Sequence, residues 1–274
     1  MNYQYDLIII GDSTEGNQLV KSIAAANLNI KIAFVSRDFK TSTTPDFLNV
    51  EYLKDEVTLT NYKNRLFGCY LKSGNQLYAT HLIFAVGQKY APFVVNNKKV
   101  PNVFNTTADI PKEAKKLPAV VLVNNETDVA MAFEVAKKYK YVYLCLDEFA
   151  GKCSEAVHKK LLQKQSSNIV VLPNTHIKKV SAYDETLINV ELDNYSTILC
   201  SAIYVKTDVS PDTSCVPTRA GLIKANEAGY FETTDKLEST LVPKCFAAGT
   251  CTQKCTKKMM NSLVETILTD FGGN

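Results

Sequence analysis

Residues 11–16, with the sequence Gly-Asp-Ser-Thr-Glu-Gly, lie between an apolar run and a helical pattern. A loop that holds the pyrophosphate of a dinucleotide here needs three small residues: one for the tight turn, one for close approach of the phosphate and one for helix packing. Gly11 and Gly16 fill the first and third positions, Ser13 replaces the second glycine, and Thr14 follows it. Serine is small and can donate a hydrogen bond, so the loop indicates weakened dinucleotide binding. A glycine turn kept for packing alone is the alternative.

The end of the second expected strand carries the residues that would contact the ribose. An acidic residue is expected about 20 residues after the loop, where it holds the ribose hydroxyls. The sequence instead reads Ser36-Arg37-Asp38. Ser36 could bond a ribose and Arg37 a phosphate, while Asp38 lies further along than the expected acid.

A second strand–loop–helix pattern begins at residue 119, and its loop is different. Residues 124–129 read Asn-Asn-Glu-Thr-Asp-Val and contain no glycine. Glu126 places a carboxylate where a diphosphate would lie, and two like charges a few ångströms apart in a partly dry loop cost about 1 to 4 kcal/mol. We therefore predict that NAD(P)H does not bind at residues 124–129 and that this half is a structural or docking unit.

The chain has eight cysteines but contains no Cys-x-x-Cys motif. Cys251 and Cys255 are the candidate redox pair, because they lie near the start of the last expected helix, where the helix dipole favours a thiolate. The alternative is that they are small buried hydrophobic residues. The cysteine spacing fits no zinc pattern, so we expect no metal site. We assign no role to the three histidines, His81, His158 and His176.

Apolar runs alternate with helical patterns in both halves of the chain. The expected strands are residues 5–10, 31–35, 50–53, 65–71, 76–79, 81–85, 120–123, 141–145, 169–172, 177–180, 187–192, 196–199, 202–205 and 245–248. The expected helices are residues 14–27, 128–138, 153–165 and 257–271. In each half a β–α–β unit precedes a small antiparallel meander, formed in the first half by residues 50–53, 65–71 and 76–79, and then a buried strand. The repeated order indicates an α/β fold with two Rossmann-like dinucleotide-binding units.

Three further segments carry longer motifs. Residues 79–87 read A-T-H-L-I-F-A-V-G, residues 242–250 read V-P-K-C-F-A-A-G-T, and residues 229–231 read G-Y-F ahead of Thr240. They resemble the A-T-x-x-I-I-A-T-G, V-P-G-I-F-A-A-G-D and G-Y-I-x-V-D-x-x-x-x-T motifs of flavin-dependent pyridine nucleotide–disulfide oxidoreductases. The chain length and the closing helix resemble the low-molecular-weight thioredoxin reductase branch of that family.

The resemblance implies two nested Rossmann-like domains. Residues 1–112 and 222–274 would form an FAD-binding-type domain, and residues 113–221 a degenerate NAD(P)-binding-type domain. In the family, the aspartate after A-A-G bonds the ribityl chain of FAD, and here that position is Thr250. The FAD contacts that we expect are Gly11, Ser13, Thr14, Gly16, Ser36, Arg37, Ala85, Gly87, Gly249, Thr250 and Met259.

Several family features are missing from this sequence. The family's Cys-x-x-Cys is absent, and residues 144–149 end in D-E-F without the basic residues that grip the 2′-phosphate of NADPH. The last helix carries Val264 and Thr266 where the family has small residues. The stretch between the second strand and Ala79 is shorter than in the family, which implies a more exposed cofactor or none.

The overall composition excludes two classes of partner. The net charge is +3, from 31 basic and 28 acidic residues, which is too balanced to indicate binding to nucleic acid or to a membrane surface. No apolar run approaches the ~20 residues that span a bilayer. We expect a cytoplasmic protein, and the resemblance implies a homodimer and a small redox-protein partner.

Three functions fit these observations. The first is an FAD-dependent oxidoreductase that does not take electrons from NAD(P)H bound to its own inner domain. The second is a non-catalytic relative that acts as a binding or regulatory module. The third is a nucleotide sensor that binds one dinucleotide through the first loop.

Overall fold

The chain folds into two compact units. The structure, a computed structural model, describes residues 2–27, 29–37, 39, 47–107, 117–124, 126–146, 159, 168–213 and 221–272. One unit comprises residues 1–89 and 209–274, and the other residues 90–208. The second unit therefore begins and ends earlier in the chain than the domain that we expected at residues 113–221.

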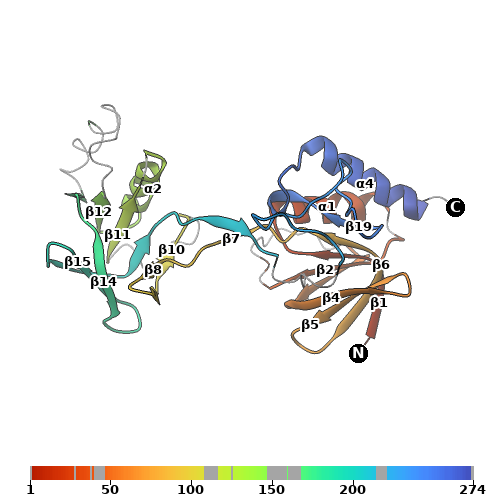
Figure 1. Cartoon of the computed structure of the whole chain (residues 1–274), viewed down its shortest axis with the longest axis horizontal. Coiled ribbons are helices and arrows are strands. Elements are labelled where there is room, and N and C mark those ends of the chain that lie inside the picture. The colour runs from red at the N-terminus through yellow and green to blue at the C-terminus, as the bar shows by residue number, and fades with distance from the viewer. Residues whose placement is uncertain are drawn as a thin grey trace. The chain divides into compact units, whose positions relative to one another are not determined.

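The first unit is built on a seven-stranded sheet (Figure 1). Its strands are β1 (Asn2–Ile10), β2 (Ile32–Ser36), β3 (Val50–Lys54), β4 (Val57–Lys63), β5 (Leu66–Leu71), β6 (Gln76–Phe84) and β19 (Cys245–Ala247). The order is β3-β2-β1-β6-β5-β4, with β19 also paired to β6. Strands β3, β2, β1, β6 and β19 are parallel, whereas β4, β5 and β6 are antiparallel.

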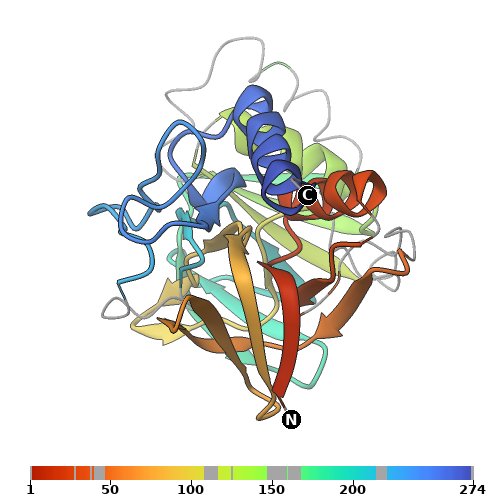
Figure 2. The same cartoon turned by 90° about the vertical axis from the view of Figure 1, so that its right-hand side faces the viewer.

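Strand β1 is apolar on both faces because both faces of the sheet are covered. Leu7 and Ile9 pack beneath two helices, while Ile8 and Ile10 face a second apolar cluster on the opposite side. A continuous apolar run of this kind is typical of a central parallel strand. The helices are α1 (Thr14–Ala26) and α4 (Lys257–Gly272), which lie side by side on one face (Figure 2).

The helix predicted over residues 257–271 is present as α4, and it packs through one apolar face. Met260, Leu263 and Ile267 are buried under α4, and Val264 and Leu268 are partly buried against the same cluster. About 100° of helix surface therefore faces the core, as the spacing of these residues requires.

One part of the predicted meander is wrong. Residues 50–53 were expected in it, but β3 pairs in parallel with β2, with Val50 opposite Ile32. The meander is instead β4, β5 and the first half of β6, and β4 was not predicted. Residues 76–79 and 81–85, expected as two strands, form the single strand β6, whose second half pairs with β19.

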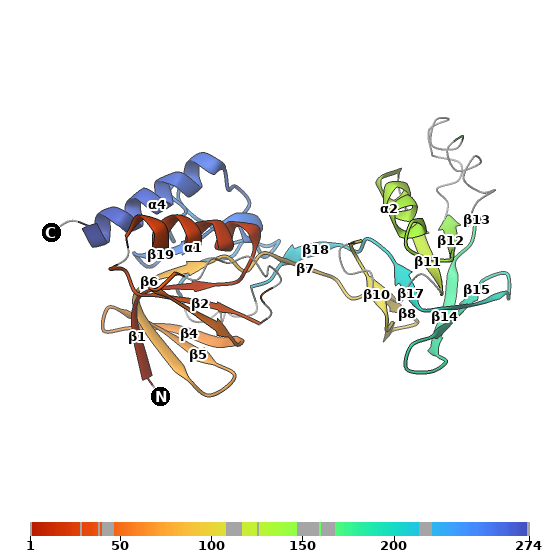
Figure 3. The same ribbon diagram turned by 180° about the vertical axis from the view of Figure 1, so that it is seen from behind.

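The second unit contains a five-stranded parallel sheet of order β10-β17-β11-β12-β13. Its strands are β10 (Val103–Phe104), β11 (Pro118–Val123), β12 (Tyr141–Leu146), β13 (Ile169–Pro173) and β17 (Ala202–Tyr204). Helix α2 (Glu126–Ala136) packs on one face. The meander of β14 (Ile177–Ala182), β15 (Ile188–Leu192) and β16 (Thr197–Cys200) covers the other (Figure 3).

Two pairs of very short strands complete the structure. Strands β8 (Val94–Val95) and β9 (Lys98–Lys99) form a hairpin in the second unit. Strands β7 (Gln88–Tyr90) and β18 (Val209–Pro211) pair with each other at the unit boundaries.

The two units repeat one topology, as the sequence indicates. The order β3-β2-β1-β6-β19 in the first corresponds to β13-β12-β11-β17-β10 in the second, each with a helix after its first strand and an antiparallel meander. The helix predicted over residues 153–165 lies outside the described residues, apart from Lys159.

A buried histidine ties β6 to the end of α4. His81 is 1% exposed, and its Nε2 atom lies 2.9 Å from Oδ2 of Asp270. Burial lowers the pKa of His81 below its ordinary value. The hydrogen bond from His81 lowers the pKa of Asp270, and Lys244, 3.6 Å from the same carboxylate, acts in the same direction.

Replacement of this histidine should flatten the pH dependence of stability. The folded chain binds fewer protons at His81 than the unfolded chain does, so the free energy of unfolding falls as the pH drops below about 6.5. We expect His81→Gln to lower the stability at pH 7 by about 1 to 3 kcal/mol. Its melting temperature should also fall less steeply than that of the wild type between pH 7 and 5.

Thermal melts at several pH values measure both effects. His176→Gln is the matched control, because His176 is exposed, and it should keep the slope of the wild type. An unchanged slope in His81→Gln would show that this histidine does not control the acid sensitivity.

Candidate functional site

Three glycines of the first unit meet at one edge of its sheet. Gly11, Gly87 and Gly249 follow the parallel strands β1, β6 and β19, which are neighbours in the sheet. Their φ angles are +98°, +71° and +82°, in the region that favours glycine. Ligands of open α/β sheets bind outside the carboxyl ends of the strands, so this edge is the candidate site.

Packing alone explains both glycines of the loop at residues 11–16, without any ligand. A Cβ atom on Gly11 would lie 2.5 Å from the carbonyl oxygen of Ala85. A Cβ atom on Gly16 would lie 2.4 Å from the carbonyl oxygen of Gly11 and 3.0 Å from Cβ of Ala85. The close approach of α1 to β6 therefore demands glycine at both positions, and their presence alone does not indicate a bound phosphate.

Ser13 acts as the N-cap of α1. Its hydroxyl oxygen accepts a hydrogen bond of 3.2 Å from the backbone N–H of Gly16. The side-chain amide of Asn17 donates to the carbonyl oxygens of Asp12 (2.9 Å) and Ser13 (3.1 Å), which fixes the loop. The serine at the second loop position thus satisfies an N–H group of the helix terminus and keeps its own proton available for donation.

The remaining contacts at this edge bring Ser13, Gly87 and Thr250 together. A Cβ atom on Gly87 would lie 3.5 Å from Cβ of Ser13 and 3.9 Å from Oγ1 of Thr250, which are ordinary contact distances. Thr250 belongs to the 3-10 helix η3 (Gly249–Cys251) and is exposed, as is Thr14. Met259, by contrast, packs against the apolar cluster beneath α4.

The loop at residues 11–16 itself contains two carboxylates, Asp12 and Glu15, and the sequence pattern did not single out either. A Cβ atom on Gly249 would lie 2.6 Å from Oε2 of Glu15, so this carboxylate rests against the turn after β19. Asp12 accepts a hydrogen bond of 2.9 Å from the hydroxyl of Ser36. The loop therefore carries negative charge. Ser36, the predicted ribose contact, is already bonded to Asp12.

Arg37 is also engaged within the first unit. It forms an ion pair with Asp212, whose side chain is 8% exposed, and lies 3.9 Å from Oε1 of Glu56. Lys89 lies 3.5 Å from the other oxygen of Asp212. Asp212 thus competes with any phosphate for Arg37. Asp38 lies outside the described residues.

The two candidate redox cysteines are free thiols. Cys251 is buried, and its thiol donates to the carbonyl oxygen of Ala248 at 3.1 Å. Burial raises its pKa to about 11. Burial also raises the pKa of Cys255, and the charge of Glu15 adds to that increase. Both effects oppose the thiolate that the dipole of α4 was expected to favour.

The corresponding loop of the second unit is closed by a buried carboxylate. Asp128, in the first turn of α2, is 0% exposed, and its Oδ2 atom accepts a 3.0 Å hydrogen bond from the backbone N–H of Asn124. The ammonium group of Lys206 lies 3.3 Å from Oδ1. Asp128 therefore places a carboxylate in the first turn of α2, the part of a helix that can bind a phosphate.

Sequence reasoning selected a different acid in this loop. Glu126 was expected to block it, and the structure does not describe that side chain. The available signal for Asp128 was its position as an acidic residue in the first turn of an expected helix.

The described parts of the chain contain no group of three or more histidine, cysteine or acidic residues able to hold a metal ion. Within those same parts, none of the helices combines the length and the apolar character needed to cross a membrane.

The comparisons with known proteins agree with this architecture. The family model described as pyridine nucleotide-disulphide oxidoreductase matches residues 15–266. No curated protein sequence matches the chain.

Solved structures with the same fold include two thioredoxin reductases. The enzyme from Lactococcus lactis, in its FR conformation, has 13% sequence identity and a TM-score of 0.67, with 98% of each chain covered. The enzyme from T. acidophilum has 12% identity and a TM-score of 0.62, again with 98% of each chain covered.

A longer flavoprotein also shares the fold. The Cu(II) complex of the HOCl-induced flavoprotein disulfide reductase RclA from Escherichia coli has 14% identity and a TM-score of 0.68. The match covers 99% of this chain and 71% of that one. Because the family model spans nearly the whole sequence, the chain belongs to the pyridine nucleotide-disulphide oxidoreductase family.

Proposed function

We propose that this chain is an FAD-dependent oxidoreductase of the thioredoxin reductase type, with FAD held by the first unit and no NAD(P)H site in the second. The observation that carries the proposal is the convergence of Gly11, Gly87 and Gly249 around Ser13 and Thr250 at the carboxyl edge of the sheet. The second unit offers no equivalent, because its loop contains no glycine and bonds to Asp128.

The first unit would hold a dinucleotide once Glu15 moves and Ser36 and Arg37 exchange their present partners for the nucleotide. The backbone turn and the N-terminus of α1 would hold the diphosphate, with help from Ser13 and Thr14. Thr250 would bond the ribityl chain, and Ser36 and Arg37 would contact the adenosine half. Glu15 lies across this path, but its carboxylate ends a flexible side chain that can swing away. Bound FAD would supply reversible two-electron chemistry, which the protein itself lacks.

The electron donor under this proposal is not an NAD(P)H molecule bound at residues 124–129. A reduced small redox-protein partner, or NAD(P)H that reacts without a binding site of its own and leaves as NAD(P)+, would reduce the flavin instead. The raised thiol pKa values of Cys251 and Cys255 make a direct role for this pair in thiol–disulfide exchange slow at neutral pH.

A second candidate is a binding module without catalytic activity. The carboxylates of Asp12 and Glu15 favour it, since both lie where negative charge opposes a diphosphate. The oxidoreductase should bind FAD, whereas the module should not. Steady turnover of NADH or NADPH with any acceptor would exclude the module.

An absorbance scan of freshly purified protein separates them. The oxidoreductase should carry flavin bands or acquire them after incubation with excess FAD and removal of free cofactor. A protein that stays colourless after this treatment would overturn the flavin assignment.

A thermal-shift panel of FAD, NAD(H), NADP(H) and ADP would then test a nucleotide sensor, since ligand at about 100 times Kd adds about 2.7 kcal/mol of stability.

Removal of the charge on Glu15 should strengthen FAD binding. Glu15→Gln keeps the size of the side chain and removes the repulsion of the diphosphate. We expect a 5- to 20-fold lower Kd, which corresponds to about 1 to 2 kcal/mol. Titration of FAD with the protein, followed by the quenching of flavin fluorescence, measures this Kd.

Glu265→Gln is the matched control, because Glu265 is an exposed glutamate on α4. It should bind FAD as the wild type does. Weaker binding in Glu15→Gln would mean that the carboxylate holds the cofactor rather than repelling it.

The closed loop of the second unit predicts a negative result with NADPH. Asp128→Asn keeps the shape of the side chain but leaves Lys206 without its charged neighbour, so we expect a loss of about 1 to 3 kcal/mol in stability. Because the variant adds no glycine, NADPH should raise the melting temperature of neither variant nor wild type. Asp235→Asn, at an exposed aspartate, is the control. A rise with NADPH that Asp128→Asn abolishes would place a working site in this loop.

A further inference from the structure

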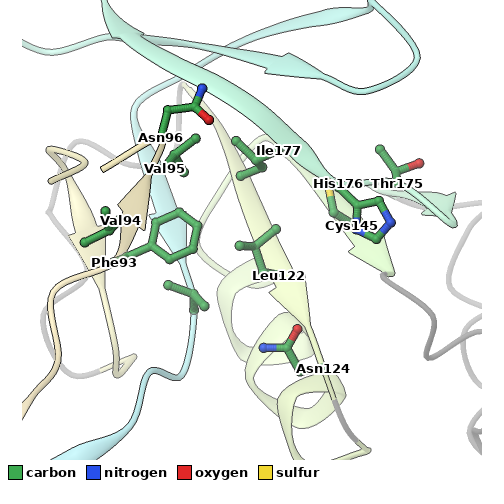
Figure 4. Close-up of a pocket in the computed structure, with 11 residues that line it drawn as sticks. Phe93, Val94, Val95, Asn96, Leu122, Asn124, Cys145, Thr175, His176 and Ile177 are labelled. Carbon is green, nitrogen blue, oxygen red and sulfur yellow. The ribbon is translucent and has the colours of Figure 1, made fainter. Parts of the chain in front are cut away.

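The second unit contains a pocket that the proposed FAD chemistry does not use (Figure 4). It has a volume of about 340 Å³ and lies on the sheet face opposite α2, where Leu122 and Cys145 project from β11 and β12. Strand β8 and the start of β14 form its sides. Small-molecule sites in proteins begin at about 300 Å³, so the pocket has room for a ligand of one or two rings.

One wall of the pocket is apolar. It comprises Phe93, Val95, Leu122, Ile177 and Val205. Figure 4 shows Phe93 and the two β8 valines on one side, with Leu122 and Ile177 between them and the polar side. A flat ring placed against Phe93 and Leu122 would bury apolar surface on both of its faces.

The other end of the pocket is polar, and the lining residues that the structure describes there include no acidic side chain, lysine or arginine. Four residues line it: Cys145, Thr175 and His176 lie together, and Asn124 lies apart from them, beyond Leu122 (Figure 4). Burial raises the pKa of Cys145 to about 12, so its thiol is neutral. The hydroxyl of Thr175 donates to the carbonyl oxygen of Pro173 at 2.9 Å. The polar end therefore offers hydrogen-bonding groups without a fixed charge.

Two lysines are neighbours of lining residues in the sequence, but their side chains do not line the pocket. Lys178 follows Ile177, but its ammonium group lies 3.4 Å from Oε1 of Glu191. Lys206 follows Val205 and lies beside Asp128. Neither lysine lines the pocket, so the described lining residues offer an anion no lysine or arginine to balance its charge.

We propose that this pocket binds a small uncharged aromatic molecule, with its ring against Phe93 and Leu122 and a hydrogen-bonding edge toward Asn124 and His176. Because the described lining residues include no lysine or arginine, they favour this ligand over an intact dinucleotide, whose phosphates they would leave unpaired. Val94 and Asn96 are exposed at the rim, which leaves the pocket open to solvent on that side. The inference does not depend on FAD binding, because every lining residue belongs to the second unit.

Indole is a suitable probe because the chain contains no tryptophan. Indole emission can then be excited selectively and followed as the full-length protein is added. We expect a saturable blue shift with a Kd of about 0.1 to 1 mM, which is ordinary for a ligand of this size. Indole-3-carboxylate, which differs by one negative charge, should bind at least five-fold more weakly.

Two matched variants locate the binding. Val95→Phe places a larger side chain in the pocket and should weaken indole binding at least five-fold. Val170→Phe makes the same change on β13 at an exposed residue that does not line the pocket, and should bind indole as the wild type does. Melting curves confirm that both variants are folded.

Three results would each overturn the proposal: no saturable binding to the wild type, equal binding of the carboxylate, or unchanged binding by folded Val95→Phe. If Val95→Phe does not fold, Asn124→Leu replaces it. Asn124 is exposed at the polar end, and loss of its amide should weaken indole-3-carboxamide, which has a polar edge, more than indole. Equal effects on the two probes would exclude the proposed orientation.

Discussion

Near the start of the first helix of each unit, a side chain accepts a hydrogen bond from a backbone N–H group of the loop, and the charge of that side chain separates the two halves of the molecule. In the first unit the N–H of Gly16 bonds to the hydroxyl of Ser13, a neutral group that adds no charge to the loop. In the second unit the N–H of Asn124 bonds to the buried carboxylate of Asp128. A neutral cap leaves the dipole of α1 available to an anion. A carboxylate held at 0% exposure beside Lys206 already supplies one.

Packing explains the two glycines of the loop at residues 11–16 without a cofactor. Contacts with Ala85 and with the loop backbone demand glycine at positions 11 and 16, whatever the loop binds. The loop of the second unit has no glycine, and the side chain of Asp128 bonds to its backbone instead. The balance of charge around each loop is therefore a better guide to nucleotide binding than the number of glycines. In the first unit that balance includes Glu15, whose side chain is long and flexible enough to move.

Much of the fold could be predicted because its strongest signals are local. The continuous apolar run of β1 and the spacing of apolar residues in α4 each lie within a short stretch of the chain. Strand β3 was misassigned because a short alternating run looks the same in a parallel edge strand as in a meander. Strand β4 was missed for the related reason that most of its side chains are at least partly exposed.

The site was harder to predict, since its decisive contacts join distant residues. Arg37 and Asp212 are 175 positions apart, and no pattern in the sequence relates them. The contact of Glu15 with Gly249 depends on the parallel placement of β1, β6 and β19. The thiol pKa values of Cys251 and Cys255 depend on burial, which the nearby helix N-terminus does not reveal. Sequence patterns therefore located the loops but not the charges that face them.

The most direct measurement of this account is the electron density of crystals grown with both FAD and NADPH. The account predicts a diphosphate at the N-terminus of α1, between Ser13 and Thr250, with Glu15 turned away from Gly249 and the loop at residues 124–129 still bonded to Asp128. A nucleotide seated on residues 124–129, with the turn at Gly11 empty, would contradict it.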